Sequence, residues 1–250
     1  MSAYNPYSLE GKTILITGAS SGIGRATAIE CSRMGAKCII TGRNEERLNE
    51  TFTQLEGEGH VQIIADLSTQ EGIDAIIDST PQLDGLVNNA GQGFNKPIGF
   101  YKQKDLENVF QTNLFSSMLL TSGLSKAKKI QKGASLVYVS SIASQETAFG
   151  NGIYGATKAA VASFMRYCAQ EMGNRKVRAN AVLPGMIETK LIHRGIYSEE
   201  QLEEAKDGYV LKRYGKPEEV AWAIIYLLSD AAAWVTGTSL LIDGGKMLVK

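Results

Sequence analysis

The amino-acid sequence predicts an α/β protein: a Rossmann-type, doubly wound parallel sheet of about seven strands with helices on both faces. Short continuous apolar runs alternate along the chain with stretches of helical spacing, as expected for buried strands joined by crossover helices. A glycine-rich turn, TGASSGIG, stands at the first strand–helix junction. The chain has 250 residues, of which 44% are hydrophobic, so we expect residues 1–250 to form one domain around one core.

Each expected strand is a short apolar run, and several of them end in glycine or serine. The runs predict strands over 12–18, 37–42, 61–67, 84–91, 134–141, 177–185 and 238–245. Helical spacing predicts helices over 23–35, 44–57, 103–129, 152–173 and 217–229, with one short helix before the fourth strand. The crossovers are expected to be right-handed. Residues 186–215 are rich in charge and glycine, and we expect them to form a mobile substrate flap.

The composition argues against several classes of partner. Lys plus Arg and Asp plus Glu both number 26, so the net charge is zero, and no basic stripe indicates nucleic acid. No apolar run reaches about 18 residues and the first residues lack a signal-peptide pattern, so we expect a cytoplasmic protein without a membrane partner. The three cysteines and two histidines have no metal-ligand spacing, so we expect buried thiols in a reducing compartment and no metal site.

The turn TGASSGIG, residues 17–24, fits a phosphate site. Glycines at 18, 22 and 24 remove side chains where the backbone turns tightly and where a phosphate must come close. The helix that follows presents free N–H groups and the positive end of its dipole to a pyrophosphate. Many strand–helix turns carry glycine, so it is the position at the first junction that favours nucleotide binding.

The end of the second expected strand indicates the form of the cofactor. Dinucleotide-binding folds place an acid there against the adenosine ribose, whereas a nearby arginine favours a 2′-phosphate. Here Gly42 stands in the place of the acid and Arg43 follows it. We therefore expect NADP(H) rather than NAD(H), unless Arg43 merely begins a charged loop. Asp66, at the end of the third strand, would meet the adenine edge or cap the next helix.

Tyr154 and Lys158 stand four residues apart in GIYGATKAA and so share one face of the expected helix. A free phenol has a pKa of about 10 and a nearby cation favours the phenolate, so the pair is either an acid with its tuning cation or an ordinary amphipathic pair. Other residues favour the first alternative, because sites in open α/β sheets gather at the carboxyl ends of strands. Ser141 and Gly91 follow two such strands, and Asn113 lies inside a helix, where asparagine is mildly unfavourable unless it has a function.

The chain resembles the short-chain dehydrogenase/reductase superfamily, single-domain branch, through motifs in the family's order and spacing: TGASSGIG, Asp66, NNAG, Asn113, Ser141, Tyr154-x-x-x-Lys158 and PG-x-IET. The resemblance implies hydride transfer between a nicotinamide and a carbonyl or alcohol carbon. Tyr154 would be the general acid/base, and Lys158 would lower its pKa and hold the nicotinamide ribose. Ser141 would orient the substrate carbonyl, and Asn113 would support a water in a proton relay.

The same resemblance implies which residues bind the cofactor, with Ile187 and Thr189 on the nicotinamide carboxamide. The expected contacts are Gly18, Ser20, Ser21, Gly22, Ile23, Gly24, Arg43, Asp66, Leu67, Asn89, Ala90, Gly91, Tyr154, Lys158, Pro184, Gly185, Ile187 and Thr189.

The segment from Lys212 to Gly245 is similar to the ending of the 3-oxoacyl carrier-protein reductase subgroup. That similarity implies a 3-oxoacyl thioester substrate, an acidic acyl carrier protein as a partner, and a homotetramer or dimer. Lys132 and Arg175 would then lie near the site entrance to receive the carrier. Phe149 indicates partly apolar substrate contact, although a packed loop would carry the same residue.

Several departures and alternatives stay open. The segment 68–83 is short for the family's fourth helix, and Ser21 stands where some NADP-dependent members carry a basic residue. That leaves Arg43, together with Arg25, as the phosphate anchor. Steroids, sugars and small ketones are alternative substrates, and a non-catalytic nucleotide-binding protein is an alternative function. A sugar-nucleotide epimerase would need more chain. His193 is either a substrate contact or an exposed flap residue.

Overall fold

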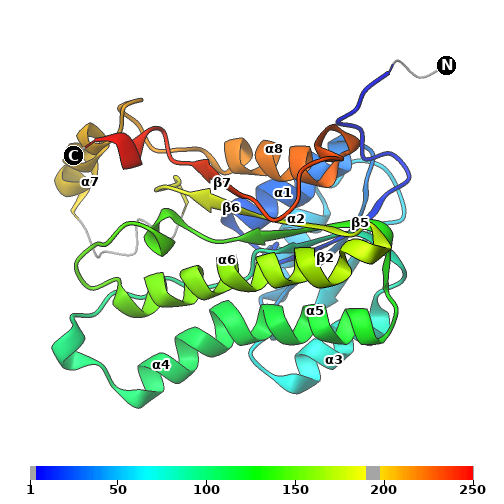
Figure 1. The fold of residues 1–250 in the computed structure, drawn as a ribbon, viewed down its shortest axis with the longest axis horizontal. Coiled ribbons are helices and arrows are strands. Elements are labelled where there is room, and N and C mark those ends of the chain that lie inside the picture. Colours follow the sequence, from blue (N-terminus) through cyan, green and yellow to red (C-terminus); the bar gives the residue numbers. More distant parts are fainter. Residues whose placement is uncertain (1–3, 190–197, 250) are drawn as a thin grey trace.

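One parallel sheet of seven strands organises the residues that the computed structural model describes, 4–189 and 198–249 (Figure 1). The strand order is β3-β2-β1-β4-β5-β6-β7, and every pairing is parallel. The strands are β1 Thr13–Thr17, β2 Lys37–Gly42, β3 Val61–Ile64, β4 Leu83–Asn88, β5 Ile130–Val139, β6 Arg178–Pro184 and β7 Ser239–Ile242. The strand order reverses between β1 and β4, which makes their carboxyl ends the switch point at which such sheets bind ligands. The predicted doubly wound α/β fold is confirmed.

Helices cover both faces of this sheet (Figure 1). One face is covered by α3 Gln70–Ser79, α5 Ser116–Lys126 and α6 Gly152–Met172. The other face is covered by α1 Gly22–Arg33, α2 Glu45–Phe52 and α8 Pro217–Leu228. The remaining α-helices of the described chain are α4 Gln103–Phe110 and α7 Glu199–Ala205.

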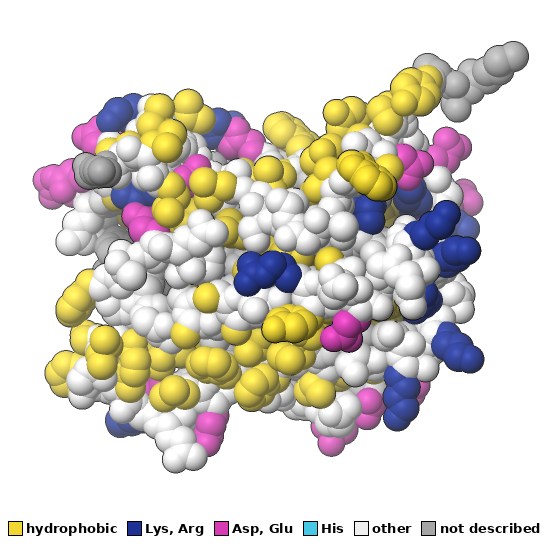
Figure 2. All heavy atoms as spheres, in the orientation of Figure 1, with side chains coloured by type: hydrophobic (Ala, Val, Ile, Leu, Met, Phe, Trp, Pro, Cys, Tyr) yellow, Lys and Arg dark blue, Asp and Glu magenta, His cyan; other side chains and the backbone are white. Residues whose placement is uncertain are grey.

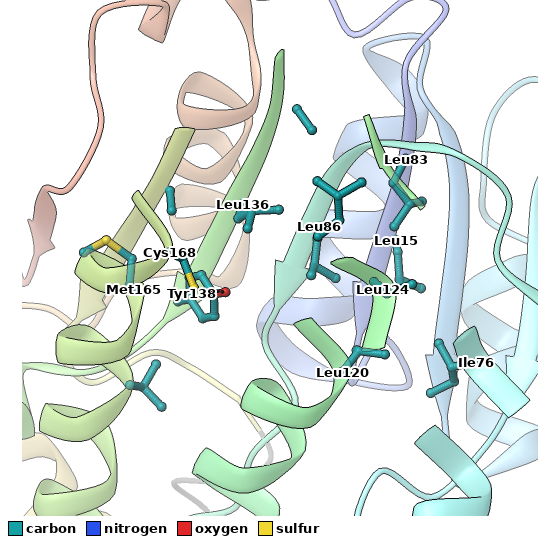
Figure 3. Packing of buried hydrophobic residues seen from close by; sticks show 14 of the residues in the cluster. Leu15, Ile76, Leu83, Leu86, Leu120, Leu124, Leu136, Tyr138, Met165 and Cys168 are labelled. Atoms are coloured by element: carbon teal, nitrogen blue, oxygen red, sulfur yellow. Dashed lines mark hydrogen bonds between the residues drawn. The ribbon is translucent and has the colours of Figure 1, made fainter. Parts of the chain in front are cut away.

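The core consists of two layers because successive strand residues point to opposite faces of the sheet. In β1, Ile14 and Ile16 pack against the α1 and α8 side, whereas Leu15 packs against the α5 side. Figure 3 shows Leu15 close to Leu86 of β4 and Leu124 of α5, all of them fully buried. Burial on both faces explains why the strands read as continuous apolar runs. Each such side chain contributes about 1.5–3 kcal/mol of transfer free energy.

The predicted helical stretch over 103–129 is present from residue 103 to residue 126, but it is not one regular α-helix. Helix α4 ends at Phe110, a π-helical turn covers Gln111–Phe115, and α5 follows and ends at Lys126. The turn has i→i+5 hydrogen bonds, which a 3.6-residue period does not reveal. Strand β5 begins at Ile130, four residues before the expected start, because Ile130 is fully buried and pairs with β4 despite the polar residues after it.

Other element boundaries also differ from the predictions. Helix α2 ends at Phe52 instead of residue 57, because the chain turns through the positive-φ residues Gly57 and Gly59. The short helix expected before β4 is present as α3. The expected flap contains the short helix α7, whose Leu202 belongs to a small buried cluster with two tyrosines. His193 lies outside the described residues. Among the described helices, none combines the length and apolar character that crossing a membrane requires.

Candidate active site

The candidate residues meet at the carboxyl edge of the parallel sheet, at the left-hand end of Figure 1. The loops that leave β1, β4, β5 and β6 all reach this edge, because parallel strands end on the same side. Helix α6 begins there and brings Tyr154 and Lys158 in its first two turns. Sequence positions as distant as residues 18 and 189 therefore belong to one region of the molecule.

The glycine loop and the NNAG segment are held together by Thr17 and Asn89. The Thr17 hydroxyl oxygen accepts hydrogen bonds from the backbone N–H groups of Asn89 (2.9 Å) and Ala90 (3.0 Å). In return, Asn89 Nδ2 donates to the carbonyl oxygens of Thr17 (2.9 Å) and Gly18 (3.3 Å). The two loops thus form one unit, which predefines the wall that a dinucleotide would contact.

The glycine loop forms a cradle that any Cβ atom would fill. A Cβ on Gly24 would lie 2.3 Å from the carbonyl oxygen of Gly18, and one on Gly18 would lie 2.9 Å from the Cα of Ala90. Gly18 and Gly22 also have positive φ angles, of 67° and 55°. The Ser21 side chain makes no cap at the start of α1, which leaves that helix N-terminus open to an anion. This geometry fits a pyrophosphate, with Ile23 in the first turn of the helix.

The end of β2 presents an exposed cation to this cradle. Arg43 forms no hydrogen bond or ion pair with any residue that the structure describes, and its side chain is exposed. A Cβ on Gly42 would lie 3.2 Å from the Cβ of Ser20, so the position before Arg43 has little spare room. Asp66 accepts hydrogen bonds from the backbone N–H and hydroxyl of Ser68 (2.9 and 2.8 Å). These bonds, together with the nearby Arg43, hold the pKa of Asp66 below its ordinary value.

Arg25, the second expected phosphate anchor, forms several hydrogen bonds within the protein, and its contact with a phosphate stays a prediction. Its Nε donates to the Thr51 hydroxyl (3.0 Å), and its Nη2 donates to the Ser20 carbonyl oxygen (2.9 Å) and the Glu50 carboxylate (2.8 Å). The guanidinium therefore ties the glycine loop to α2. Leu67, expected near the adenine, is buried in the core layer on the α5 side.

Tyr154 and Lys158 lie close together, with Lys158 buried and Tyr154 half-buried. Lys158 Nζ is 5.7 Å from the centroid of the Tyr154 ring and donates a 2.8 Å hydrogen bond to the carbonyl oxygen of Val139. Burial lowers the pKa of Lys158 to about 8. Burial also raises the pKa of Tyr154, and the neighbouring Ser141 hydroxyl offsets only part of that increase. Desolvation of the phenolate is the largest cause of this increase, and the lowering of the Tyr154 pKa by Lys158 stays a prediction for the cofactor-bound site.

Ser141 lies at the end of β5, next to the first turns of α6. Its hydroxyl oxygen accepts a 3.2 Å hydrogen bond from the backbone N–H of Ala143. Helix α6 comes so near this turn that a Cβ on Gly155 would lie 2.6 Å from the Ala143 carbonyl oxygen. The preceding Ser140 is buried and donates a 2.8 Å hydrogen bond to the carbonyl oxygen of Lys158. Gly155 thus permits the approach that brings Ser141 and Tyr154 together.

Asn113 projects from the π-helical turn into the same region. Its Oδ1 accepts from the Gln92 backbone N–H (2.7 Å), and its Nδ2 donates to the Gln92 carbonyl oxygen (3.0 Å) and to Thr157 Oγ1 (3.2 Å). A Cβ on Gly91 would lie 3.3 Å from Asn113 Oδ1 and 3.4 Å from Lys158 Nζ. The asparagine therefore fixes the loop after NNAG beside Lys158. Neither Gln92 nor Thr157 was expected from the sequence.

The PG-x-IET segment also reaches the glycine loop. Pro184 ends β6, and the backbone N–H of Gly185 donates to Ile242 of β7 (2.9 Å). Ile187 is buried. A Cβ on Gly22 would lie 3.3 Å from the Thr189 methyl carbon, so Thr189 contacts the proposed phosphate cradle. The structure thus places the PG-x-IET segment, expected at the nicotinamide, beside the glycine loop, expected at the pyrophosphate.

Lys132 and Arg175 do not lie near the site entrance of this chain, so that prediction is wrong. Lys132 stands near the start of β5, and Arg175 donates to the carbonyl oxygen of Ile130, at the same place. Both belong to the amino edge of the sheet, whereas Ser141 and Tyr154 belong to the carboxyl edge. Figure 2 shows Lys and Arg side chains gathered at the right-hand end, opposite the candidate site.

Comparisons with known proteins agree with this geometry. A family model described as enoyl-(acyl carrier protein) reductase matches residues 18–246. The 3-oxoacyl-[acyl-carrier-protein] reductase of Thermotoga maritima is 35% identical over 96% of this chain and 99% of its own length. The L-rhamnose 1-dehydrogenase (NAD(P)(+)) of Azotobacter vinelandii is 35% identical over 94% of this chain and 96% of its own.

The fold comparison leads to the same group of proteins. The crystal structure of L-sorbose reductase from Gluconobacter frateurii, complexed with NADPH and L-sorbose, matches with a TM-score of 0.89 and 28% identity, over 97% of this chain and 99% of that one. The sheet order, the glycine cradle and the Ser141–Tyr154–Lys158 cluster are thus found in a chain whose relatives are oxidoreductases. The chain belongs to the short-chain dehydrogenase/reductase family and is an NAD(P)-dependent oxidoreductase acting on CH–OH or C=O groups.

Proposed function

We propose that the protein is an NADP(H)-dependent reductase of 3-oxoacyl thioesters, with Tyr154 as the general acid/base. The observation that carries the proposal is the meeting of Ser141, Tyr154 and Lys158 beside the glycine cradle. Residues 1–250 are proposed to form one nucleotide-binding domain, in which 186–215 act as the substrate flap.

The mechanism that we propose assigns proton transfer to Tyr154. When bound, the nicotinamide supplies the hydride. Because burial raises the pKa of Tyr154, the phenol stays protonated at neutral pH and can donate its proton to the carbonyl oxygen of the substrate. The Ser141 hydroxyl orients that carbonyl. The Lys158 ammonium then stabilises the tyrosinate that remains.

In this proposal Asn113 fixes the backbone of Gln92 and supports a water in the proton relay. Its amide atoms are all engaged with Gln92 and Thr157, and the side chain is buried. Asn113 Oδ1 accepts only one hydrogen bond, so its second lone pair is left for the relay water that the family resemblance implies.

The cofactor assignment is supported by the end of β2. Gly42 offers no carboxylate to a ribose hydroxyl, and the exposed Arg43 forms no hydrogen bond or ion pair with the described residues. A guanidinium binds phosphate through strong, directed hydrogen bonds. The related L-sorbose reductase structure holds NADPH. NADP(H) is therefore proposed over NAD(H).

The substrate assignment is supported by apolar side chains near the site. Ile98, Phe100 and Phe149 are exposed over 79%, 71% and 85% of their surface. Asn95 Nδ2 donates to the Phe149 carbonyl oxygen (3.1 Å), which joins the loop before α4 to the loop after Ser141. Figure 2 shows hydrophobic side chains gathered at the lower left, where the loop before α4 lies. An acyl chain would cover such a surface, and the Thermotoga maritima relative is named for this substrate class.

A sugar or polyol is the second candidate substrate, because the rhamnose dehydrogenase and the sorbose reductase are relatives of comparable coverage. An acyl carrier protein is the proposed partner only if the thioester assignment holds.

A homotetramer is the proposed assembly. Phe115 in the π-helical turn, Leu119 on α5 and Tyr167 on α6 are exposed. Trp234 and Leu241 are exposed near β7. Two separate apolar faces suit two kinds of subunit contact.

A cytoplasmic location is proposed because Cys31, Cys38 and Cys168 are free and buried.

The test is the initial rate of NADPH and NADH oxidation, measured in parallel with an acetoacetyl thioester, L-sorbose and a small ketone. Fast NADPH-dependent reduction of the thioester supports the proposal. Preference for the sugar moves the substrate class to polyols, and cofactor binding without any turnover contradicts the proposed catalysis.

A further inference from the structure

One buried hydroxyl, that of Thr157, joins Asn113 to the helical turn that carries Tyr154 and Lys158. The orientation of the Asn113 amide is fixed by Gln92, whose backbone N–H can only donate and therefore faces Oδ1 (2.7 Å). The Nδ2 group is then the donor to Thr157 Oγ1 (3.2 Å). The Thr157 hydrogen remains for the carbonyl oxygen of Tyr154 (2.7 Å).

The two hydrogen bonds therefore run in one direction, from the Asn113 amide to the Thr157 oxygen and from the Thr157 hydroxyl to the Tyr154 carbonyl oxygen. Thr157 and Asn113 are buried, so water does not compete for these bonds. A buried amide hydrogen that loses its acceptor carries the full penalty of its desolvation. This series of hydrogen bonds thus has one favourable arrangement, and that arrangement depends on an oxygen atom at position 157.

The opposite side of the same turn is also held. Ser140 donates to the carbonyl oxygen of Lys158 (2.8 Å), and Lys158 Nζ donates to the carbonyl oxygen of Val139 (2.8 Å). The turn from Tyr154 to Lys158 is thereby fixed between the end of β5 on one side and Asn113 on the other. Without the Thr157 oxygen, only the β5 side remains.

We propose that Thr157 is a positioning residue for the reaction: its hydroxyl sets the Tyr154–Lys158 turn against Asn113. The inference rests on the proposed function of Tyr154. Thr157 is not among the residues proposed to contact the substrate or the cofactor. It acts only by placing Tyr154, the proposed general acid. Small displacements of a reacting group reduce turnover strongly, which gives such a residue a measurable effect.

Two substitutions separate the hydroxyl from the methyl group of Thr157. Thr157→Val keeps the shape and removes the oxygen, whereas Thr157→Ser keeps the oxygen and removes the methyl group. We expect Thr157→Val to lower kcat by about tenfold with KM and the NADPH Kd within about twofold of wild type, and Thr157→Ser to recover most of the loss.

The matched control is Thr80→Val. Thr80 is also buried and also donates to a carbonyl oxygen of its own helix (Ile76, 2.6 Å), but it stands at the end of α3, away from the site. We expect Thr80→Val to lower the Tm without lowering kcat. Unchanged kcat in Thr157→Val, or equal impairment of Thr157→Val and Thr157→Ser, overturns the inference.

A second measurement keeps the inference separate from the proposed function. If the wild type reduces none of the carbonyl substrates, the proposed function fails. Tyrosine labelled with ¹³C at Cζ then reports on position directly, with the Tyr154 resonance assigned through Tyr154→Phe. A shifted Tyr154 resonance in Thr157→Val that returns in Thr157→Ser supports the positioning role. Identical resonances in all three proteins contradict it.

Discussion

Lys158 Nζ lies 2.8 Å from the carbonyl oxygen of Val139 and donates a hydrogen bond to it. Lys158 is only 5% exposed, and this backbone carbonyl accepts the hydrogen bond of its ammonium group. No carboxylate is among the causes that shift its pKa, and burial is the cause. The cluster therefore keeps a cation in an unfavourable place, which is expected where a charge serves a reaction rather than the fold.

The stability of the cofactor-free protein is predicted to rise when Lys158 is replaced by methionine. Burial lowers the pKa of Lys158 from 10.5 to about 8, so the unfolded chain binds this proton more tightly. The penalty is complete below pH 8 and vanishes as the pH rises toward 10.5. Lys158→Met should raise the free energy of unfolding at pH 7 by up to about 3 kcal/mol, and the gain should shrink at pH 9 and pH 10. Urea unfolding at the three pH values measures it, and a variant less stable than wild type at pH 7 contradicts it.

Tyr154→Phe is predicted to lower kcat by about a thousandfold or more, because the variant has no proton to donate. NADPH binding, followed by fluorescence titration, should stay within about threefold of wild type. Tyr167→Phe is the matched control, since Tyr167 lies on the same helix with an exposed ring. Substantial turnover in Tyr154→Phe would show that another group supplies the proton.

Arg43→Ala is predicted to weaken NADPH binding by about tenfold or more and NADH binding by less than about twofold, because only NADPH carries the 2′-phosphate. Isothermal titration with both cofactors measures the difference. Arg25→Ala serves for comparison: its guanidinium holds the Ser20 carbonyl, so its loss should weaken both cofactors alike. Equal losses in Arg43→Ala would show that Arg43 does not contact the phosphate.

Gly155→Ala is predicted to lower both the Tm and kcat. A Cβ at this position would lie 2.6 Å from the Ala143 carbonyl oxygen, so α6 must move away from the turn after Ser141. We expect a destabilisation of about 1–3 kcal/mol by thermal unfolding. Gly173→Ala, at the other end of α6, meets nothing within 4 Å and should leave kcat unchanged. A Gly155→Ala protein with wild-type kcat and Tm is incompatible with this close approach.

The sequence was sufficient to predict the sheet and the edge at which the candidate residues gather, because both depend on local patterns. Continuous apolar runs mark strands buried on both faces, and the residues after them belong to the functional edge. The π-helical turn at Gln111–Phe115 was not predictable, because it differs from an α-helix only in the hydrogen-bond partner. Asn113 stabilises it through Gln92, a contact between residues distant in sequence.

The roles of Thr157, Arg25 and Lys132 needed the structure for different reasons. Thr157 was visible as the one polar residue between Tyr154 and Lys158, but its partner Asn113 lies outside α6. Arg25 has the right charge near the cradle, and only its contacts with Ser20 and Glu50 show that the charge is already engaged. Lys132 stands close to Ser141 in sequence, yet a strand of this length separates the two edges of the sheet.

The contact between Gly42 and Ser20 couples two positions that belong to different loops. An acid at position 42 is the usual way to favour NAD(H), but its Cβ would come within 3.2 Å of the Ser20 side chain. A lineage that acquired the acid first would crowd the glycine loop before gaining a new ribose contact. Only glycine at position 20 would remove the Cβ that causes this contact. Positions 42 and 20 are therefore sterically coupled, and a change of residue at one of them alters the space available at the other.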